Sequence, residues 1–387
     1  MNNTNTDTDT DIDPGKGALA YSKPAPSSNQ DAPAQITPAL SPIMGAMTRE
    51  QAAPARKIGV ESGGRALLKY LGGMALAFLP FALFFQDSYW LNILAFTYLM
   101  GALAAAWNII GGFAGQFSLG HGVFFGIGAY ATARLYTLFD LSPWLTMLPA
   151  ALFAALIAVL ISWPTFRLRG PFFAIATMAF NEVAFVIANH FDSLTNGAGG
   201  ILIPFKAGFA NMIFAQRWQY ALLMFAFAAL VIGVTLLLRR SRLGYYLLAV
   251  REDEDAAGAA GINVLGVKLQ GMALSAALTS MGGTLFVMYL RFVDPSTLFT
   301  LSEVGVKFAL LALIGGIGTV AGPLLGAALI IPFENILRAE LAGALPGINL
   351  AILGFLMVLA ALFMKRGLVG ALTDWWRKLH SLWRKKS

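Results

Sequence analysis

The chain has 387 residues, of which 57% are hydrophobic and 12% are charged, and it contains no cysteine. Soluble domains carry about 25% charged residues, so this composition and a mean hydropathy of +0.68 indicate a membrane protein. The missing cysteine excludes disulfides and thiolate metal sites. His121, His190 and His380 are the only histidines, and their spacing matches no metal site. We expect no cofactor.

Residues 1–55 are polar and rich in Thr, Asp, Asn, Pro and Ala. Such a segment buries too little apolar surface to order itself, and it does not resemble a secretory signal peptide. We predict a disordered polar cytoplasmic tail here. Beyond it, apolar runs of about 20 residues recur, and each can cross roughly 30 Å of hydrocarbon as a helix. They lack the alternating polarity of membrane barrel strands.

The sequence therefore predicts an all-α, polytopic membrane protein with about ten transmembrane helices. In chain order they cover residues 66–85, 90–110, 117–139, 144–163, 171–191, 218–238, 268–290, 302–314, 320–337 and 348–364. They belong to one transmembrane domain, residues 56–370. Tryptophans alternate with Arg and Lys in residues 371–387, which predicts a basic interfacial tail on the cytoplasmic side.

The distribution of Lys and Arg predicts the orientation. With ten spans and a cytoplasmic N-terminus, 17 of these residues fall in inner segments. Five fall in outer segments or helix ends, namely Arg134, Lys206, Arg217, Arg291 and Arg338. Short cytoplasmic loops carry the excess of positive charge in membrane proteins. We therefore place both termini in the cytoplasm and attribute the basic balance to the membrane surface, not to nucleic acid.

The longest polar segment inside the transmembrane domain is residues 239–267. Four consecutive acids, residues 252–255, are followed by small residues and then by Gly261. Acidic side chains are favourable at a helix N-terminus, and glycine commonly ends a helix. The pattern is compatible with a short cytoplasmic helix over residues 255–260. A solvated acidic loop without helix is the alternative.

At this point the sequence resembles a known family. The string Asp255-Ala256-Ala257-x-x-x-Gly261 is similar to the Glu-Ala-Ala-x-x-x-Gly element of ABC importer membrane subunits, with Asp in place of Glu. Further segments resemble the branched-chain amino-acid permease of the LivM type, and the resemblance runs from about residue 90 to 370. They are residues 107–121, 125–130, 170–182, 243–263, 314–318 and 322–327.

The resemblance implies a permease subunit of an ATP-driven importer for branched-chain amino acids in the bacterial inner membrane. It also implies that the short helix couples to an ATPase subunit through Glu252, Asp255, Ala256, Ala257 and Gly261. The chain has no G-x-x-x-x-G-K-[ST] motif for binding ATP. The expected partners are two cytoplasmic ATPase subunits, a second, related permease subunit forming a heterodimer, a periplasmic solute-binding protein and membrane lipid. We expect no enzymatic activity of the chain itself.

Polar residues inside the spans are candidates for the substrate pathway. An intramembrane charge costs about 2.5–3.5 kcal/mol on insertion scales and usually faces the protein interior. Glu182 lies near the middle of the fifth span beside Asn181, and Gln116, Ser118 and His121 lie in a glycine-rich segment. Broken, glycine-rich helices often hold transporter substrates. Structural hydrogen bonds and tight helix packing are the alternatives for these positions.

Two acid–base pairs, Glu303 with Lys307 and Glu334 with Arg338, have the i,i+4 spacing that stabilises helices. We interpret them as helix pairs. A proton-coupled secondary transporter using Glu182, Glu303 or Glu334 is a rival function, and a permease for urea or short-chain amides is another. The segments 110–115 and 314–318 share an Ile-Gly-Gly pattern. It indicates either an internal duplication or two ordinary glycine turns.

Overall fold

The computed structural model describes residues 63–83, 86–168 and 170–341, together with residues 351–352, 354–355, 367–371 and 373. All of these residues belong to the unit Gly63–Ser387, and the remaining unit is Met1–Ser62. The predicted N-terminal tail therefore lies outside the described residues. The predicted tenth span and the basic C-terminal tail lie outside them except at a few positions.

The described part of the chain follows the first nine predicted spans in order. Five helices are long and apolar enough to cross a membrane, including α3 with its π-helical extension η1 (Ile109–Phe113). The all-α, polytopic prediction is confirmed, whereas the count of ten and the side of the termini stay predictions. The helices are α2 (Gly63–Leu83), α3 (Ser88–Asn108), α4 (His121–Phe139), α5 (Pro143–Thr165), α6 (Pro171–His190), α8 (Arg217–Arg240), α11 (Val264–Leu290), α13 (Gly305–Gly316) and α14 (Gly322–Glu340).

Several predicted span boundaries differ from the structure by up to four residues, and two of them lie at breaks in the helical backbone. The third span begins at His121 and not at residue 117, because residues 115–120 carry no regular helix and Gly115 turns the chain with φ +70°. The eighth span begins at Gly305 and not at residue 302. At both junctions apolar residues are interspersed with polar and small ones, so the apolar pattern alone did not reveal where the helical backbone begins.

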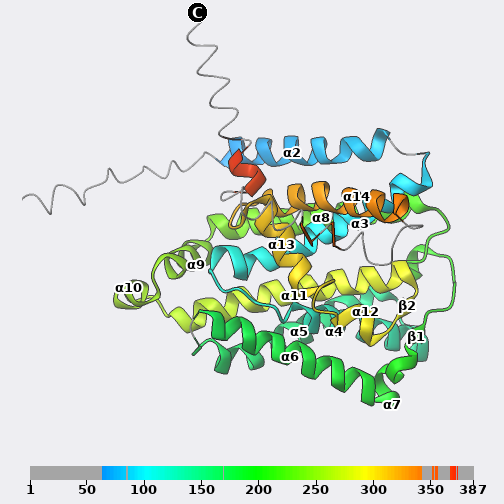
Figure 1. Ribbon diagram of the computed structural model, residues 1–387, viewed down its shortest axis with the longest axis horizontal. Helices are drawn as coiled ribbons and strands as arrows, with labels where there is room; N and C mark the ends of the chain where they lie inside the picture. Colours follow the sequence, from blue (N-terminus) through cyan, green and yellow to red (C-terminus); the bar gives the residue numbers. More distant parts are fainter. Residues whose placement is uncertain are drawn as a thin grey trace, which may run out of the picture. The chain divides into compact units, whose positions relative to one another are not determined.

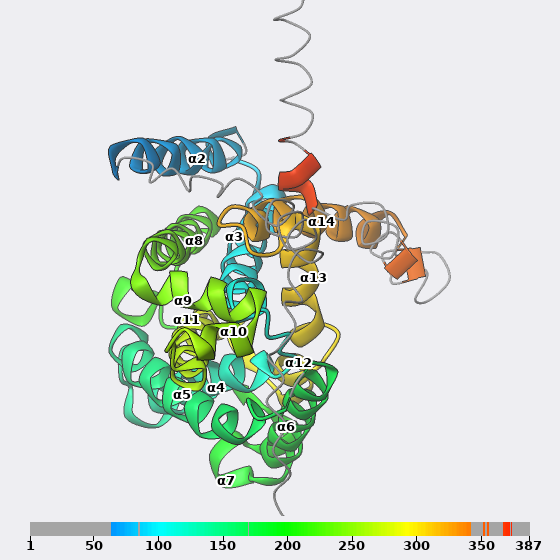
Figure 2. The same cartoon turned by 90° about the vertical axis from the view of Figure 1, so that its left-hand side faces the viewer.

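Helix α11 lies at the centre of the unit, and α3, α4 and α5 pack around it (Figures 1 and 2). Helix α3 also packs against α8, α13 and α14. In the most apolar window of α3 with η1, 94% of the residues are buried, against 22% in α6. Helix α3 is thus enclosed by protein, whereas α6 turns most of its apolar surface outward.

Different elements gather at the two ends of the helices (Figure 1). Helices α9 (Arg242–Glu252) and α10 (Glu254–Ala259) lie at the end where α11 begins. At the opposite end, β1 (Ile201–Leu202) pairs antiparallel with β2 (Phe292–Val293). This end also carries α7 (Asp192–Thr195), η2 (Gly197–Gly199), η3 (Phe209–Asn211) and α12 (Pro295–Phe299). The 27 residues of α11 separate the two ends by about 40 Å at 1.5 Å per residue.

Asp294 caps the start of helix α12, and its side chain accepts a hydrogen bond from the backbone N–H of Thr297. Burial raises the pKa of the Asp294 carboxyl, but hydrogen bonds from Ser296 and Thr297 outweigh it, so the pKa lies below its ordinary value. A hydrogen-bonded carboxylate at a helix N-terminus is a favourable cap. It fixes the start of α12 directly after β2.

Candidate functional site

The short helix α10 is defined at both ends by local hydrogen bonds. Asp253 caps its start, because the Asp253 carboxylate accepts from the backbone N–H groups of Asp255 and Ala256 at 2.9 Å each. At its end, Gly261 N–H donates to Gly258 O and Ile262 N–H donates to Ala257 O, at 3.0 and 3.1 Å. This pair of bonds is a Schellman motif. The helix begins one residue earlier than predicted, and the alternative of an acidic loop without helix is wrong.

The backbone conformation of this motif requires glycine at position 261. Its φ is +85°, a left-handed conformation that glycine adopts without the steric cost met by other residues. The glycine of the Asp-Ala-Ala-x-x-x-Gly string therefore ends α10.

The five residues predicted to couple to an ATPase divide into two groups. Glu252, Asp255, Ala256 and Gly261 are exposed, whereas Ala257 is 6% exposed and belongs to the apolar core. Helix α10 thus turns one small residue toward the helices and presents an acidic and small-residue surface outward. Figure 2, viewed from this side, shows α9 and α10 in front of the other helices.

An ion pair ties α10 to the central helix. The Lys268 ammonium on α11 lies 2.5 Å from Glu254 Oε1 on α10, and the Gln116 amide donates to the same oxygen at 2.9 Å. The Lys268 side chain is 3% exposed, and its ammonium lies 5.6 Å from the ring centroid of Phe166. A buried ammonium needs such a partner, because an unpaired buried charge is strongly unfavourable.

A second set of contacts ties α9 to the two glycine-rich segments. Arg251 donates to Gly112 O at 2.7 Å. Asn108 accepts from Gly318 N–H at 2.8 Å and donates to Thr319 O at 2.9 Å. A Cβ on Gly112 would lie 1.9 Å from Asn108 Oδ1, so this approach requires glycine. The two Ile-Gly-Gly segments are therefore joined through Asn108, and Arg251 contacts the first of them.

Two of the predicted pathway residues, Ser118 and His121, form a buried hydrogen-bonded chain with Ser275. His121 Nε2 lies 2.9 Å from Ser275 Oγ, which itself donates to Ala106 O at 2.7 Å. Because the single hydroxyl hydrogen of Ser275 goes to Ala106 O, Ser275 Oγ accepts from Nε2–H of His121. Nδ1 of His121 then accepts from Ser118 Oγ at 3.1 Å. A neutral imidazole satisfies every one of these bonds. The chain joins α4 to α3 and α11.

The other three pathway residues lie in different surroundings. Gln116 contacts Glu254 beside α10, as described above. Asn181 is buried and donates to Phe299 O at 2.7 Å, which joins α6 to α12. Glu182 is exposed on the outward face of α6. The five residues thus do not form one cluster in this chain, and their assignment to the substrate pathway stays a prediction.

The sequence reasoning did not single out Asn108, Arg251, Glu254 or Lys268 as functional residues. Only Lys268 carried a usable signal, since it is a lone ammonium at the start of an apolar span that follows an acidic segment. The contacts of Asn108 and Arg251 span more than 130 positions of the chain, and no local pattern marks them. Among the described residues, no group of three or more His, Asp or Glu side chains is placed to hold a metal ion.

Comparison with known proteins adds independent information. The family model for "Branched-chain amino acid transport system / permease component" matches residues 89–361. The high-affinity branched-chain amino acid transport system permease protein LivM of Escherichia coli (strain K12) is 29% identical over 301 residues, which cover 72% of this chain and 69% of that protein. The corresponding LivH protein of the same strain is 24% identical, over 69% of this chain and 90% of its own length.

A further relative is the probable branched-chain amino acid transport permease protein LivM of Methanocaldococcus jannaschii, 24% identical over 60% of this chain and 68% of that protein. No solved structure matches the chain. The family model covers more than half of the chain and includes α3 to α14 with the α9–α10 segment. The chain therefore belongs to the branched-chain amino-acid transport permease family and is a multi-pass membrane component of a transport system.

Proposed function

We propose that this chain is a permease subunit of an ATP-driven importer that carries branched-chain, hydrophobic amino acids across the bacterial inner membrane. Helix α10 carries the proposal. It is a capped helix with an exposed surface of acids and small residues, and it is anchored to the transmembrane helices from both sides. An element that transmits the motion of a separate ATPase subunit needs both an exposed docking surface and a firm connection to the transmembrane helices.

The contacts at α10 indicate how such a push is transmitted. Lys268 and Glu254 connect α10 to α11, the central helix. Arg251 connects the end of α9 to η1, and Asn108 extends this connection to the segment between α13 and α14. Coupling between distant sites needs a contiguous network of packed and hydrogen-bonded groups. This network reaches three of the membrane helices that surround α3.

The family relatives support the proposed partners. LivM and LivH of Escherichia coli are both named permease proteins of a high-affinity branched-chain amino acid transport system, and this chain resembles both. We infer a heterodimer with a second, related permease subunit, two cytoplasmic ATPase subunits docked at α10, and a periplasmic solute-binding protein. Orientation of α10 toward the cytoplasm follows from the excess of Lys and Arg in the inner segments.

In this proposal Glu182 lies where the substrate pathway meets the second permease subunit, because it is a carboxylate on an outward, otherwise apolar helix face. Asn181, Ser118 and His121 hold α4, α6, α11 and α12 in position beside that pathway. Gln116 supports the coupling contact at Glu254.

The test is a bulky substitution on the exposed side of α10. Ala257 is unsuitable, because it is buried and a larger side chain would disturb packing within the chain. Ala256 is exposed, so Ala256→Trp clashes only with a docked partner. The matched control is Gln270→Trp, at an exposed position on α11. We expect Ala256→Trp to reduce ATP-dependent leucine uptake by about tenfold or more, which corresponds to about 1.4 kcal/mol of lost docking energy.

Uptake is measured in proteoliposomes that contain the complete complex, and co-purification of the ATPase with each variant is measured in parallel. Gln270→Trp should behave as the unchanged chain. Normal uptake and normal ATPase binding by Ala256→Trp would contradict the docking role. Leucine uptake by this chain alone under a proton gradient would establish the secondary transporter instead. Uptake of urea or acetamide but not leucine would reassign the substrate.

A further inference from the structure

A cavity of about 560 Å³ lies at the end of the helices opposite α10. It is bordered by α3, α4, α11, α12, α13 and α14, and its volume falls within the range of about 300–1,000 Å³ typical of small-molecule sites. The apolar part of its wall includes Phe96, Met100, Phe286, Leu290 and Ile331. Helix α12, which borders the cavity, also packs against α6, the helix that carries Glu182.

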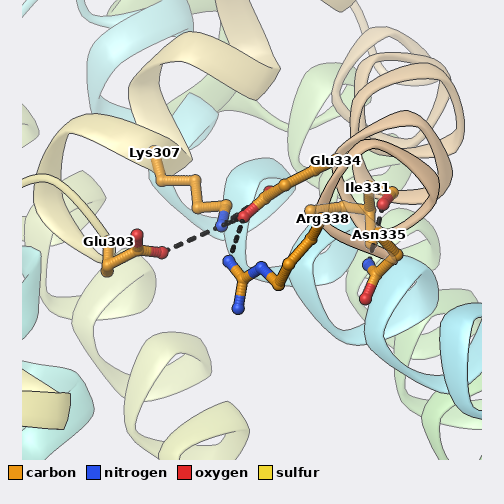
Figure 3. Close-up of polar contacts among 6 residues, drawn as sticks. All are labelled: Glu303, Lys307, Ile331, Glu334, Asn335 and Arg338. Atoms are coloured by element: carbon orange, nitrogen blue, oxygen red, sulfur yellow. Dashed lines mark hydrogen bonds and ion pairs between the residues drawn. The ribbon is translucent and has the colours of Figure 1, made fainter. Parts of the chain in front are cut away.

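Four charged residues form the polar part of the same wall, and they make one network (Figure 3). The Lys307 ammonium lies 3.0 Å from Glu303 Oε2 and 2.9 Å from Glu334 Oε2. Arg338 donates to Glu334 Oε1 at 2.9 Å. The two i,i+4 pairs predicted from the sequence are confirmed, and the contact between Lys307 and Glu334 joins them across α13 and α14.

The members of this network differ in their access to solvent. The side chains of Glu334 and Lys307 are 9% and 12% exposed, whereas those of Glu303 and Arg338 are 46% and 59% exposed. The inner pair therefore neutralises itself within the protein. The outer members are a carboxylate and a guanidinium of opposite charge, which remain accessible from the cavity.

The geometry of Arg338 leaves donors available for a ligand. Arginine carries five N–H donors in a planar fork that matches a carboxylate. One amino group of Arg338 donates to Glu334 Oε1, and the other points away from Glu334 (Figure 3). The Glu303 carboxylate contacts Lys307 through Oε2, so its second oxygen can accept from an ammonium group. Two acids and two bases have no net charge, which favours a dipolar ligand over a simple anion or cation.

We propose that this cavity binds an aliphatic amino acid in its zwitterionic form, an inference that rests on the proposed transport function. The α-carboxylate binds the guanidinium of Arg338 and the α-ammonium binds the carboxylate of Glu303. The branched side chain lies against Phe286 and Leu290. Lys307 and Glu334 hold the two recognition groups in position without contacting the ligand.

The absence of cysteine from the chain allows a direct test by thiol protection. Thr297 lines the cavity and is exposed, so Thr297→Cys places a thiol at its wall. The matched probe is Ser193→Cys, at an exposed position of α7 that does not line the cavity. Each variant is assembled into the complete transport complex, and the rate of maleimide labelling of this chain is measured with and without L-leucine.

We expect L-leucine at ten times its Kd to slow labelling of Thr297→Cys about tenfold, by mass action, and to leave Ser193→Cys unchanged. 4-Methylpentanoate, which lacks the ammonium, and 3-methylbutylamine, which lacks the carboxylate, should each require at least about tenfold higher concentration. That factor corresponds to the loss of about 1.4 kcal/mol. Equal protection by leucine and both analogues would overturn recognition of the zwitterion.

In the Thr297→Cys background, Arg338→Gln should abolish protection by leucine. The control is Asp140→Asn, which removes an exposed carboxylate that pairs with Lys206 outside the cavity and should retain protection. If Arg338→Gln does not assemble, Glu303→Gln tests the exposed opposite end of the network. A complex that imports leucine with ATP but shows no protection overturns the cavity proposal alone. A complex that imports no branched-chain amino acid overturns the proposed function.

Discussion

Two serines on α11 have the same burial and different hydrogen bonding. Ser275 and Ser280 are both 0% exposed. Ser275 Oγ contacts His121 Nε2 and donates to Ala106 O. Ser280 Oγ has no hydrogen-bond partner among the described residues. A buried polar group contributes to stability only where its hydrogen bonds are made, and it is costly where its partner is removed.

We therefore predict that Ser275→Ala lowers the free energy of unfolding by about 1–3 kcal/mol, the cost of leaving the His121 N–H unsatisfied. Ser280→Ala removes a buried hydroxyl that has no partner, so it should leave the free energy of unfolding nearly unchanged or raise it slightly. Thermal unfolding of the two variants in detergent, followed by size-exclusion chromatography, measures the difference. Equal destabilisation by both substitutions would show that the hydrogen-bonded chain of His121 contributes no specific stability.

At the scale of elements, α10 and α11 are joined by one ion pair whose two ends lie in different surroundings. The Lys268 side chain is 3% exposed and that of Glu254 is 31% exposed. Removing the partner of a buried charge costs about 3–5 kcal/mol, whereas removing both members is often nearly neutral. The two single substitutions should therefore differ.

We predict that Glu254→Gln is the more destabilising single substitution, because it leaves the Lys268 ammonium buried without a carboxylate. Lys268→Met should cost less, since water can solvate Glu254. The double substitution Lys268→Met with Glu254→Gln should recover much of the stability lost in Glu254→Gln. A double-mutant cycle of unfolding free energies measures this coupling. Strictly additive effects would contradict an energetic link between α10 and α11.

At the scale of the whole molecule, the outward surface of α6 is unusual in holding a carboxylate near its middle. Glu182 is exposed beside the exposed apolar residues Met178, Val183 and Val186. Within the described residues, no hydrogen bond or ion pair reaches the side chain of Glu182. A charge facing lipid at this depth is costly. We therefore expect a partner subunit or the substrate pathway at this face in the assembled transporter.

We predict that Glu182→Leu leaves the stability of the isolated chain within about 0.5 kcal/mol, as for other exposed positions. It should reduce leucine uptake by the complete complex, and Glu182→Gln should retain part of the uptake through hydrogen bonding. Val183→Leu is the control at a neighbouring exposed position. Uptake and co-purification with the second permease subunit are the two measurements. Normal values of both for Glu182→Leu would remove Glu182 from the pathway and from the interface.

Structural features that depend on residues close together in the sequence could be predicted from the sequence. Runs of apolar residues identified the helices, since hydropathy and span length are local properties. The caps of α10 are also local, because the hydrogen bonds of Asp253, Gly261 and Ile262 join residues two to five positions apart along the chain. The pair of Glu334 with Arg338 follows in the same way from helical spacing, whereas Glu303 contacts Lys307 from the turn that precedes α13. The family resemblance rests on short segments read in order.

Only the tertiary structure decided which side chains of different elements contact one another. Arg251 reaches Gly112, Lys268 reaches Glu254, and Lys307 reaches Glu334. Each contact depends on how side chains of different helices pack, and hydrophobic periodicity does not specify the neighbour of a helix. The same packing turned Glu182 outward and enclosed Ser118 and His121. The sequence by itself thus determined the order of the helices, the caps of α10 and the family, whereas three-dimensional packing determined which charges are paired and which remain available to a substrate or a partner.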